Sequence, residues 1–373
     1  MTRSGIALPV KLMGIPVKLD PSFLLVLPLF AWLIGSQIPA LVVTLAGFGV
    51  IAQPDGGTED LASGVTPWLL GLIAAVGLFT SVVIHELGHA VVARLYGVVT
   101  VEIRLWFLGG VAQFKEMPRQ RGAEALVALA GPVTSAVLGL LLWLAVPLAG
   151  FSLGAQVVVA YLALTNVALA VFNLLPALPL DGGRILRSLL ALAFDRLRAT
   201  TIAVAVSGAL AVVLGMYGFF TGQFFLVIMA FFIYNAGRAE ASAAYIDDAV
   251  GSMKVADLMT REPLSVQSDM PLAQFARMGQ YRRHTGYPVV DDGTLVGYAF
   301  LAGAATDDPD ATVADIMVAP ETATPGEAAL GALQRIATSE TGRLMVVDGS
   351  GTLVGIVSKT DLIRVLGAGR ARA

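Results

Sequence analysis

Six long apolar runs constrain the fold of this chain more than any other feature of its sequence. They cover residues of about 22–51, 68–93, 123–148, 155–178, 199–219 and 223–236. A helix of about 20 apolar residues crosses the roughly 30 Å hydrocarbon core of a bilayer, and most of these runs reach that length. The first run is too long for a simple span, and the last is short. We count 22–51 as one crossing and expect six transmembrane helices.

The charged residues divide the chain into a membrane part and a soluble part. The whole chain is 56% apolar and 14% charged, whereas a soluble domain carries about 25% charged residues. Residues 1–240 contain 13 Lys/Arg and 11 Asp/Glu, and residues 241–373 contain 11 and 16. We therefore expect a transmembrane domain over 1–240 and a soluble domain over 241–373. The net charge of −3 gives no basic surface for nucleic acid, and the lack of cysteine excludes thiolate metal ligands.

The basic residues of the membrane part indicate its orientation, because Lys and Arg are enriched on the cytoplasmic side. Three basic residues precede the first run, and others lie within 94–121 and 184–198. The segment 52–67 instead carries three acidic residues and no basic one. With six crossings, every basic segment falls on the same side. We expect a multi-pass cell-membrane protein with both termini in the cytoplasm.

The soluble part contains an internal repeat. Val255-Ala-Asp-Leu-Met259 returns as Val313-Ala-Asp-Ile-Met317, 58 positions later. Each copy is predicted to form an initial turn, a helix, two short strands and a closing helix, with the first helices at 271–281 and 327–338. A βαββα unit this short is expected to bury its apolar face against its twin.

This duplicated pattern resembles a tandem pair of CBS domains, at about 250–303 and 308–366. The second copy contains Gly355-Ile-Val-Ser358-Lys-Thr-Asp361, which matches the nucleotide-contact segment of that family. The first copy has Gly297-Tyr-Ala-Phe-Leu-Ala-Gly303 there, without the hydroxyl or the carboxylate. The resemblance implies one adenine-nucleotide site, with Asp361 at the ribose and Ser358 near a phosphate. It also implies a homodimer formed through the paired domains.

Two of the three histidines lie four positions apart, in His85-Glu86-Leu87-Gly88-His89. On a helix these two positions share a face, so both imidazoles can reach one metal ion while Glu86 lies beside them to activate water. The alternative is a pair of hydrogen-bonded core histidines. A His-Glu-His set inside an apolar run is costly without a metal or a polar partner, so the pattern favours a metal site.

A carboxylate is the expected third ligand, because a catalytic zinc takes three protein ligands and His284 lies in the soluble repeat. Asp181 stands in Asn173-Leu-Leu-Pro176-Ala-Leu-Pro179-Leu-Asp181-Gly182-Gly183-Arg184, where two prolines break the helix and two glycines follow. Irregular backbone at membrane depth is tolerated where it lines a cavity. The alternative is a turn that leaves the bilayer, with Asp181 capping the next helix.

Together the two motifs resemble the site-2 protease family of intramembrane zinc metalloproteases, in the branch that carries CBS domains. The likeness extends from Gly14-Ile-Pro-Val-Lys-Leu to the repeat. It implies hydrolysis of peptide bonds in membrane-spanning protein substrates. By this resemblance, one Zn²⁺ is bound by His85, His89 and Asp181. Glu86 is then the general base, and Asn173 helps to hold the substrate or the developing oxyanion.

Small and polar residues in the other runs could serve either helix packing or substrate binding. Ser135, in Ala130-Gly131-Pro132-Val-Thr-Ser135, stands where many family members have an asparagine. Gly131, Ser135 and Gly139 are spaced four apart, which we interpret as helix packing rather than chemistry. Asn166, seven positions before Asn173, could bind the substrate backbone but is expected to bridge two helices.

Residues 101–114 follow the His-bearing helix directly and alternate in polarity, with aromatic residues and a Gly109-Gly110 pair. They are predicted to form a β-hairpin with a Gly-Gly turn, able to pair with an extended substrate strand. The alternative is a plain cytoplasmic loop.

The expected fold is therefore an α-helical polytopic membrane protein with about six transmembrane helices and a short membrane-associated β-hairpin, followed by an α/β tandem CBS pair. The expected function is an intramembrane zinc metalloprotease regulated by that pair. The alternative is an ion or solute transporter or channel with a CBS tail, since transporters also use broken helices and intramembrane charges. The membrane part shows no internal repeat and has Glu86 at the general-base position, and both features favour the protease.

Overall fold

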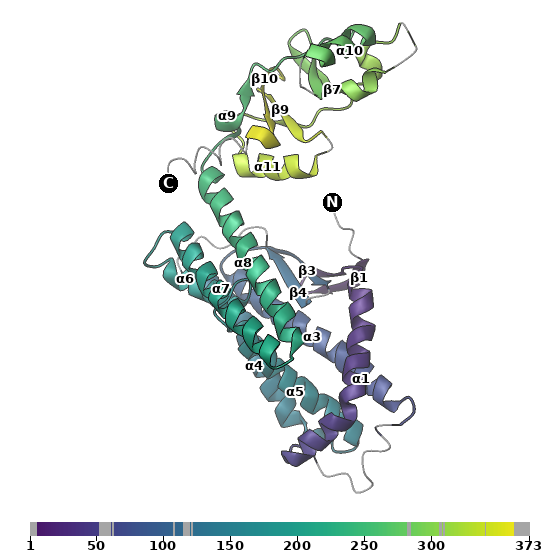
Figure 1. Ribbon diagram of the computed structural model, residues 1–373, viewed down its shortest axis with the longest axis vertical. Helices are drawn as coiled ribbons and strands as arrows, with labels where there is room; N and C mark the ends of the chain where they lie inside the picture. Colours follow the sequence, from purple (N-terminus) through teal and green to yellow (C-terminus); the bar gives the residue numbers. More distant parts are fainter. Residues whose placement is uncertain are drawn as a thin grey trace. The chain divides into compact units, whose positions relative to one another are not determined.

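The structure is a computed structural model, and it describes residues 6–51, 61, 63–106, 109–114, 120, 122–281, 285–305, 308, 310–339 and 341–361. The chain divides into two compact units, residues 2–241 and residues 242–373, and each is described by itself (Figure 1).

Six helices of the described residues are long and apolar enough to cross a membrane, as the sequence predicted. They are α1 (Phe23–Gly47), α3 (Thr66–Leu95), α4 (Ala123–Ala145), α5 (Leu153–Asn173), α7 (Arg196–Phe220) and α8 (Phe224–Val250). The run 22–51 is a single crossing, because α1 is continuous through Pro28 and Pro39. The short last run, 223–236, is only the first part of its helix, because α8 extends to Val250. The hydropathy falls after residue 236 although the helix continues. Hydropathy indicates whether a segment suits an apolar environment, and it does not mark where a helix ends.

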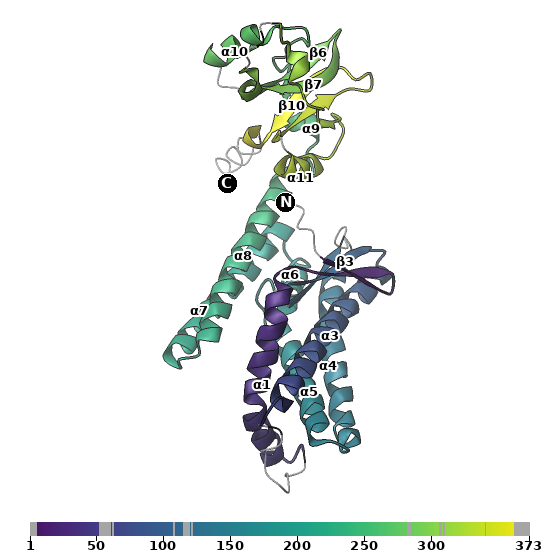
Figure 2. The ribbon, with the colours of Figure 1, turned by 90° about the vertical axis from the view of Figure 1, so that its right-hand side faces the viewer.

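Helix α3 lies at the centre of the membrane unit and packs against α1, α4 and α5 (Figure 2). Buried residues of three helices form one cluster, including Ile38 of α1, Ala74 of α3 and Val157 of α5. Small residues let the helices approach. A Cβ added at Gly71 of α3 would lie 2.2 Å from the carbonyl oxygen of Ala31, so α1 and α3 touch backbone to backbone.

A four-stranded sheet joins the start of the chain to the end of α3. Its strands are β1 (Ile6–Leu12), β2 (Ile15–Leu19), β3 (Thr100–Trp106) and β4 (Gly109–Phe114), in the order β1-β2-β3-β4. The hairpin at 101–114 is confirmed, because β3 and β4 pair antiparallel. The prediction that Gly109 and Gly110 form its turn is wrong. Trp106 pairs with Gly109, so the two glycines begin β4. The residues between the strands lie outside the described residues.

The hairpin β1–β2 was not predicted from the sequence. Its strand β2 runs parallel to β3, with Val17 opposite Ile103. Glu102 of β3 is buried and forms ion pairs with Lys18 and Arg104. Burial opposes ionisation of Glu102, but the hydrogen bonds from Lys18 and Arg104 outweigh it and lower the pKa of that carboxyl.

Between α4 and α7 the chain forms two short helices. The 3₁₀ turn η1 (Pro147–Ala149) joins α4 to α5. The segment 174–180 then leads from the end of α5 to the ten-residue helix α6 (Asp181–Leu190), which packs against α4 and α7. Asp181 is therefore the first residue of a helix that follows an irregular segment.

The soluble unit holds the repeat. Its elements are α9 (Val255–Leu258), β5 (Thr260–Arg261), α10 (Leu272–Tyr281), β6 (Gly286–Asp291), β7 (Thr294–Phe300), η2 (Leu301–Ala304), η3 (Val313–Asp315), β8 (Thr322–Ala323), α11 (Ala329–Thr338), β9 (Arg343–Val347) and β10 (Leu353–Ser358). The predicted helices near 271–281 and 327–338 correspond to α10 and α11. The closing helix of the second copy, expected to reach about 366, lies outside the described residues beyond Asp361.

The two copies exchange their opening segments. Val255 and Leu258 of the first copy are buried in the core of the second, among residues of α11, β9 and β10. Val313 of the second copy is buried in the core of the first, with residues of α10, β6 and β7. Strand β5 likewise pairs with β10. Each copy thus completes the core of the other.

Candidate metal centre

Helix α3 presents His85 and His89 on one face, one turn apart. Both side chains are buried, with 4% and 6% of the residue surface exposed. Their Nε2 atoms lie 3.2 Å apart. The four-residue spacing predicted this arrangement, because positions i and i+4 of a helix stack on the same face.

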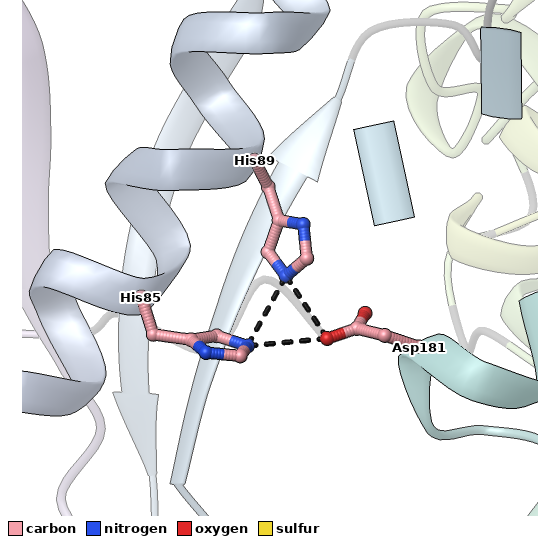
Figure 3. Close-up of side chains that lie close together, drawn as sticks. All are labelled: His85, His89 and Asp181. Atoms are coloured by element: carbon pink, nitrogen blue, oxygen red, sulfur yellow. Dashed lines mark hydrogen bonds and ion pairs between the residues drawn. The ribbon is translucent and has the colours of Figure 1, made fainter. Parts of the chain in front are cut away.

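Asp181 reaches the two histidines from the opposite side (Figure 3). Its Oδ2 lies 3.1 Å from Nε2 of His85 and 3.2 Å from Nε2 of His89. The segment before it is tightly folded: a Cβ added at Gly182 would lie 2.2 Å from the carbonyl oxygen of Leu174. The N–H of Leu178 donates to Oγ of Ser207 on α7 at 2.7 Å, which fixes the segment from a second helix.

The three donor atoms fit a metal ion. Together His85, His89 and Asp181 form a group whose ligand atoms lie within 4.8 Å of one another. Ligands placed tetrahedrally at about 2.0–2.1 Å from zinc stand roughly 3.3 Å apart, close to the 3.1–3.2 Å separations here. Two imidazoles and a carboxylate are also a donor set that zinc accepts, with one position left for water.

Helix α4 holds the other nitrogen of each histidine. Nδ1 of His89 donates to the carbonyl oxygen of Val127 at 2.8 Å, and Nδ1 of His85 lies 2.8 Å from Oγ of Ser135. A carbonyl can only accept, so the proton of His89 is on Nδ1 and Nε2 keeps its lone pair for a metal. Ser135 can accept in the same way from His85. Ser135 therefore supports His85.

Gly131 faces the centre as well, which corrects its interpretation as a packing residue. A Cβ added there would lie 2.2 Å from Nε2 of His89 and 2.6 Å from Nε2 of His85. By contrast, Gly139 meets Ala163 and Val167 of α5 and does serve helix packing. A row of small residues has the same sequence signature in both cases, so spacing alone could not separate them.

Glu86 points from α3 to the hairpin. Its Oε2 accepts a 2.9 Å hydrogen bond from the N–H of Ala112 in β4. A Cβ added at Gly110 would lie 2.9 Å from Cγ of Glu86, so the glycine lets the strand approach the helix. Sequence reasoning missed this contact. The only signal for it was the Gly109-Gly110 pair, which was interpreted as a turn.

The two asparagines of α5 differ in their surroundings. Asn166 is fully buried, and its Nδ2 donates to Oγ of Ser81 on α3 at 2.9 Å, so it bridges two helices as expected. Asn173 is the last residue of α5 and half-buried, and its Nδ2 donates to the carbonyl oxygen of Leu169 at 2.9 Å. It stands just before the segment that leads to Asp181.

In the soluble unit, Ser358 and Asp361 lie together. Oδ2 of Asp361 accepts hydrogen bonds from the N–H of Ser358 at 2.8 Å and from its hydroxyl at 2.7 Å. Oγ1 of Thr260 donates to Oδ1 at 3.2 Å. The pair therefore forms at the end of β10, beside the strand β5 contributed by the other copy.

Comparison with known proteins settles the family. The model of peptidase family M50 matches residues 73–154 and 149–216, and the CBS domain model matches 255–299 and 313–368. A zinc metalloprotease of Methanocaldococcus jannaschii is 30% identical over 95% of this chain and 94% of its own length. Rip3 of Mycobacterium tuberculosis is 31% identical over 95% of this chain and 91% of its own length. A solved site-2 protease from M. jannaschii is 29% identical and covers 64% of this chain and 95% of its own, with a TM-score of 0.42.

The chain belongs to peptidase family M50, the site-2 proteases. It is an intramembrane zinc metalloprotease with a tandem CBS pair, and family membership decides against the transporter alternative. His85, Glu86 and His89 of the first motif lie on α3, Asp181 of the second motif begins α6, and Asn173 ends α5.

Gly131→Ala tests whether the protease needs open space between the histidines. The added methyl group would occupy the position between the two Nε2 atoms, so we expect zinc affinity to fall at least tenfold, the scale seen when a metal site is disturbed. Gly208→Ala in α7 is the control, because a Cβ there meets nothing within 4 Å. Zinc content and chelator competition measure the effect. Equal affinity in the two variants would contradict the placement of the ion.

Proposed function

We propose that His85, His89 and Asp181 hold one catalytic zinc ion and that Glu86 is the general base for hydrolysis of a membrane-spanning protein substrate. The observation that carries this proposal is the convergence of three buried donor atoms from α3 and α6 at 3.1–3.2 Å. His85 and His89 precede Asp181 by 96 and 92 positions in the sequence, so local packing alone does not account for their meeting.

The residues divide the work of hydrolysis between them. A zinc ion held there would supply Lewis-acid polarisation of the scissile carbonyl and of water. Glu86 takes the proton of the attacking water and delivers it to the leaving amine nitrogen as the carbon–nitrogen bond breaks. Asn173 is proposed to hold the substrate or the developing oxyanion, because it ends α5 just before the Asp181 segment.

The substrate strand is proposed to enter along β4. This strand ends the order β1-β2-β3-β4, and no other described strand pairs with its outer side, which is the edge where a substrate strand would add. The N–H of Ala112 on β4 is bonded to Glu86. A substrate segment paired at this edge would therefore lie beside the general base, with its peptide bonds extended rather than hidden in a helix.

Glu86→Gln and Asp181→Ala separate catalysis from metal binding. Glutamine keeps the shape of Glu86 but cannot take a proton, so proteolysis of a single-span test protein is expected to fall by about 10²–10⁴-fold, with zinc retained. Asp181→Ala is expected to lose both activity and stoichiometric zinc, because one of three ligands is gone. Equal cleavage by wild type and Glu86→Gln, or full zinc in Asp181→Ala, would contradict the assignment.

We place the metal inside the membrane, nearer the cytoplasmic face, with both termini in the cytoplasm. His85 is nine residues before Arg94 and 17 after Trp68, which on a helix is about 13 Å and about 25 Å. Basic residues follow α3, and the acidic segment precedes it. Water would then reach the centre from the cytoplasmic side.

Cysteine labelling checks this orientation, because the chain has no cysteine of its own. Leu95→Cys and Val65→Cys place exposed thiols at the two ends of α3. A membrane-impermeant thiol reagent is expected to label Cys at position 95 only in inside-out vesicles and Cys at position 65 only in right-side-out ones. The reverse pattern would overturn both the orientation and the depth.

The CBS pair is proposed to bind one adenine nucleotide, to regulate the protease and to form a homodimer. The second copy carries the hydroxyl and carboxylate, and both lie at the end of β10. The first copy has Phe300 and Gly303 at those positions, so nothing there replaces the carboxylate. Asp361 would bind the ribose, and Ser358 would lie near a phosphate.

Asp361→Asn tests the nucleotide site. Asparagine can still accept from Ser358, but it loses the charge that strengthens a bond to a ribose hydroxyl, so we expect AMP and ATP to bind about tenfold more weakly. Calorimetry on the full chain measures this, with the exposed Asp269→Asn as the control. If wild type binds neither nucleotide at millimolar concentration, the CBS pair has another role.

A further inference from the structure

One face of α8 meets the segment that carries Asp181. Buried residues of α8 share a cluster with Ala177. A Cβ added at Gly237 would lie 3.7 Å from the carbonyl oxygen of Leu178. One turn later, the carboxylate of Glu240 pairs with Arg187 of α6. The residues of this row, which share one helix face by their spacing, are Ala230, Ile233, Gly237 and Glu240.

Arg187 is the polar centre of this contact. Its side chain is only 7% exposed, and it forms ion pairs with Glu124 of α4 and Glu240 of α8. Nε of Arg187 also donates to Glu124 at 3.2 Å. The next residue of α6, Ser188, accepts a hydrogen bond from the N–H of Ala125 at 3.2 Å. Helix α6 is therefore held from α4 on one side and from α8 on the other.

Helix α8 continues without a break into the soluble unit. It ends at Val250, which is fully buried in the core of the second CBS copy, with Val255 and Leu258. Glu240, which pairs with Arg187, and Val250, which is buried in the CBS core, thus belong to one helix, ten positions apart.

We propose that Arg187 is a positioning residue for the metal ligand Asp181, and that its ion pair with Glu240 couples α8, and through it the CBS pair, to the metal centre. The inference rests on the proposed zinc site. Arg187 follows Asp181 by six residues in a helix of ten, so both residues belong to the same short element.

The strength of this coupling follows from burial. A buried guanidinium that loses one carboxylate partner must follow that partner or remain incompletely paired. Movement of α8 therefore transfers to α6 rather than breaking the contact. The donor atoms of the centre stand 3.1–3.2 Å apart, and metal geometry tolerates displacements of only a few tenths of an ångström. A small movement of α6 is enough to change zinc affinity.

Zinc affinity tests the positioning role. Glu240→Gln removes one charge of the trio and leaves Arg187 paired with Glu124, so the fold is retained and zinc affinity is expected to fall about tenfold. Asp248→Asn is the matched control, because it removes the same charge from an exposed position two turns further along α8. In an Arg187→Met background, Glu240→Gln is expected to have no further effect. A full additional loss in that background would contradict the pairing.

Hydrogen exchange in the full chain tests the coupling itself. Linkage is reciprocal, so zinc at the centre must be felt along α8. We expect amides of 241–250 to exchange more slowly in zinc-loaded wild type and in Asp248→Asn than after chelation, and the difference to vanish in Glu240→Gln. Bound zinc without any difference in wild type would overturn this inference alone. A wild type that binds no zinc would overturn the proposed site as well.

Discussion

The arrangement of the membrane unit depends on the hydrogen bonds that α4 makes with residues of α3 and α6. At membrane depth an unpaired polar group costs several kcal/mol, so each nitrogen of the two histidines needs a partner. Val127 and Ser135 supply the partners for Nδ1. The first turn of α4 also fastens α6, through Glu124 and Ala125. Helix α4 contributes none of the proposed metal ligands. It is nevertheless bonded to both helices that do contribute them, α3 and α6.

Missing side chains matter as much as present ones. Gly131 leaves room between the imidazoles, Gly110 lets β4 approach Glu86, and Gly182 allows the turn before α6. At each position the nearest atom to an added Cβ would be closer than 3.0 Å. The centre is thus shaped by positions where a side chain would not fit.

Local features of the site were predictable from sequence, and distant ones were not. His85 and His89 follow from helical periodicity, and the single crossing of α1 follows from the charge pattern. Asp181 required elimination together with a family resemblance. The pairing of Val17 with Ile103 joins segments 86 positions apart, and no local pattern encodes it. The contact of Ala112 with Glu86 and the orientation of Gly131 likewise depend on how α3, α4 and β4 pack.

The exchange of opening segments in the CBS pair has an evolutionary consequence. A chain that lost one copy would expose the core of the other, because Val255 and Val313 each fill the opposite copy. A single copy therefore has a complete core only when a second copy supplies the opening segment. Substitutions that weaken one copy are also expected to lower the melting temperature of its twin, so the two sequences can diverge at their ligand sites but not at the residues they trade.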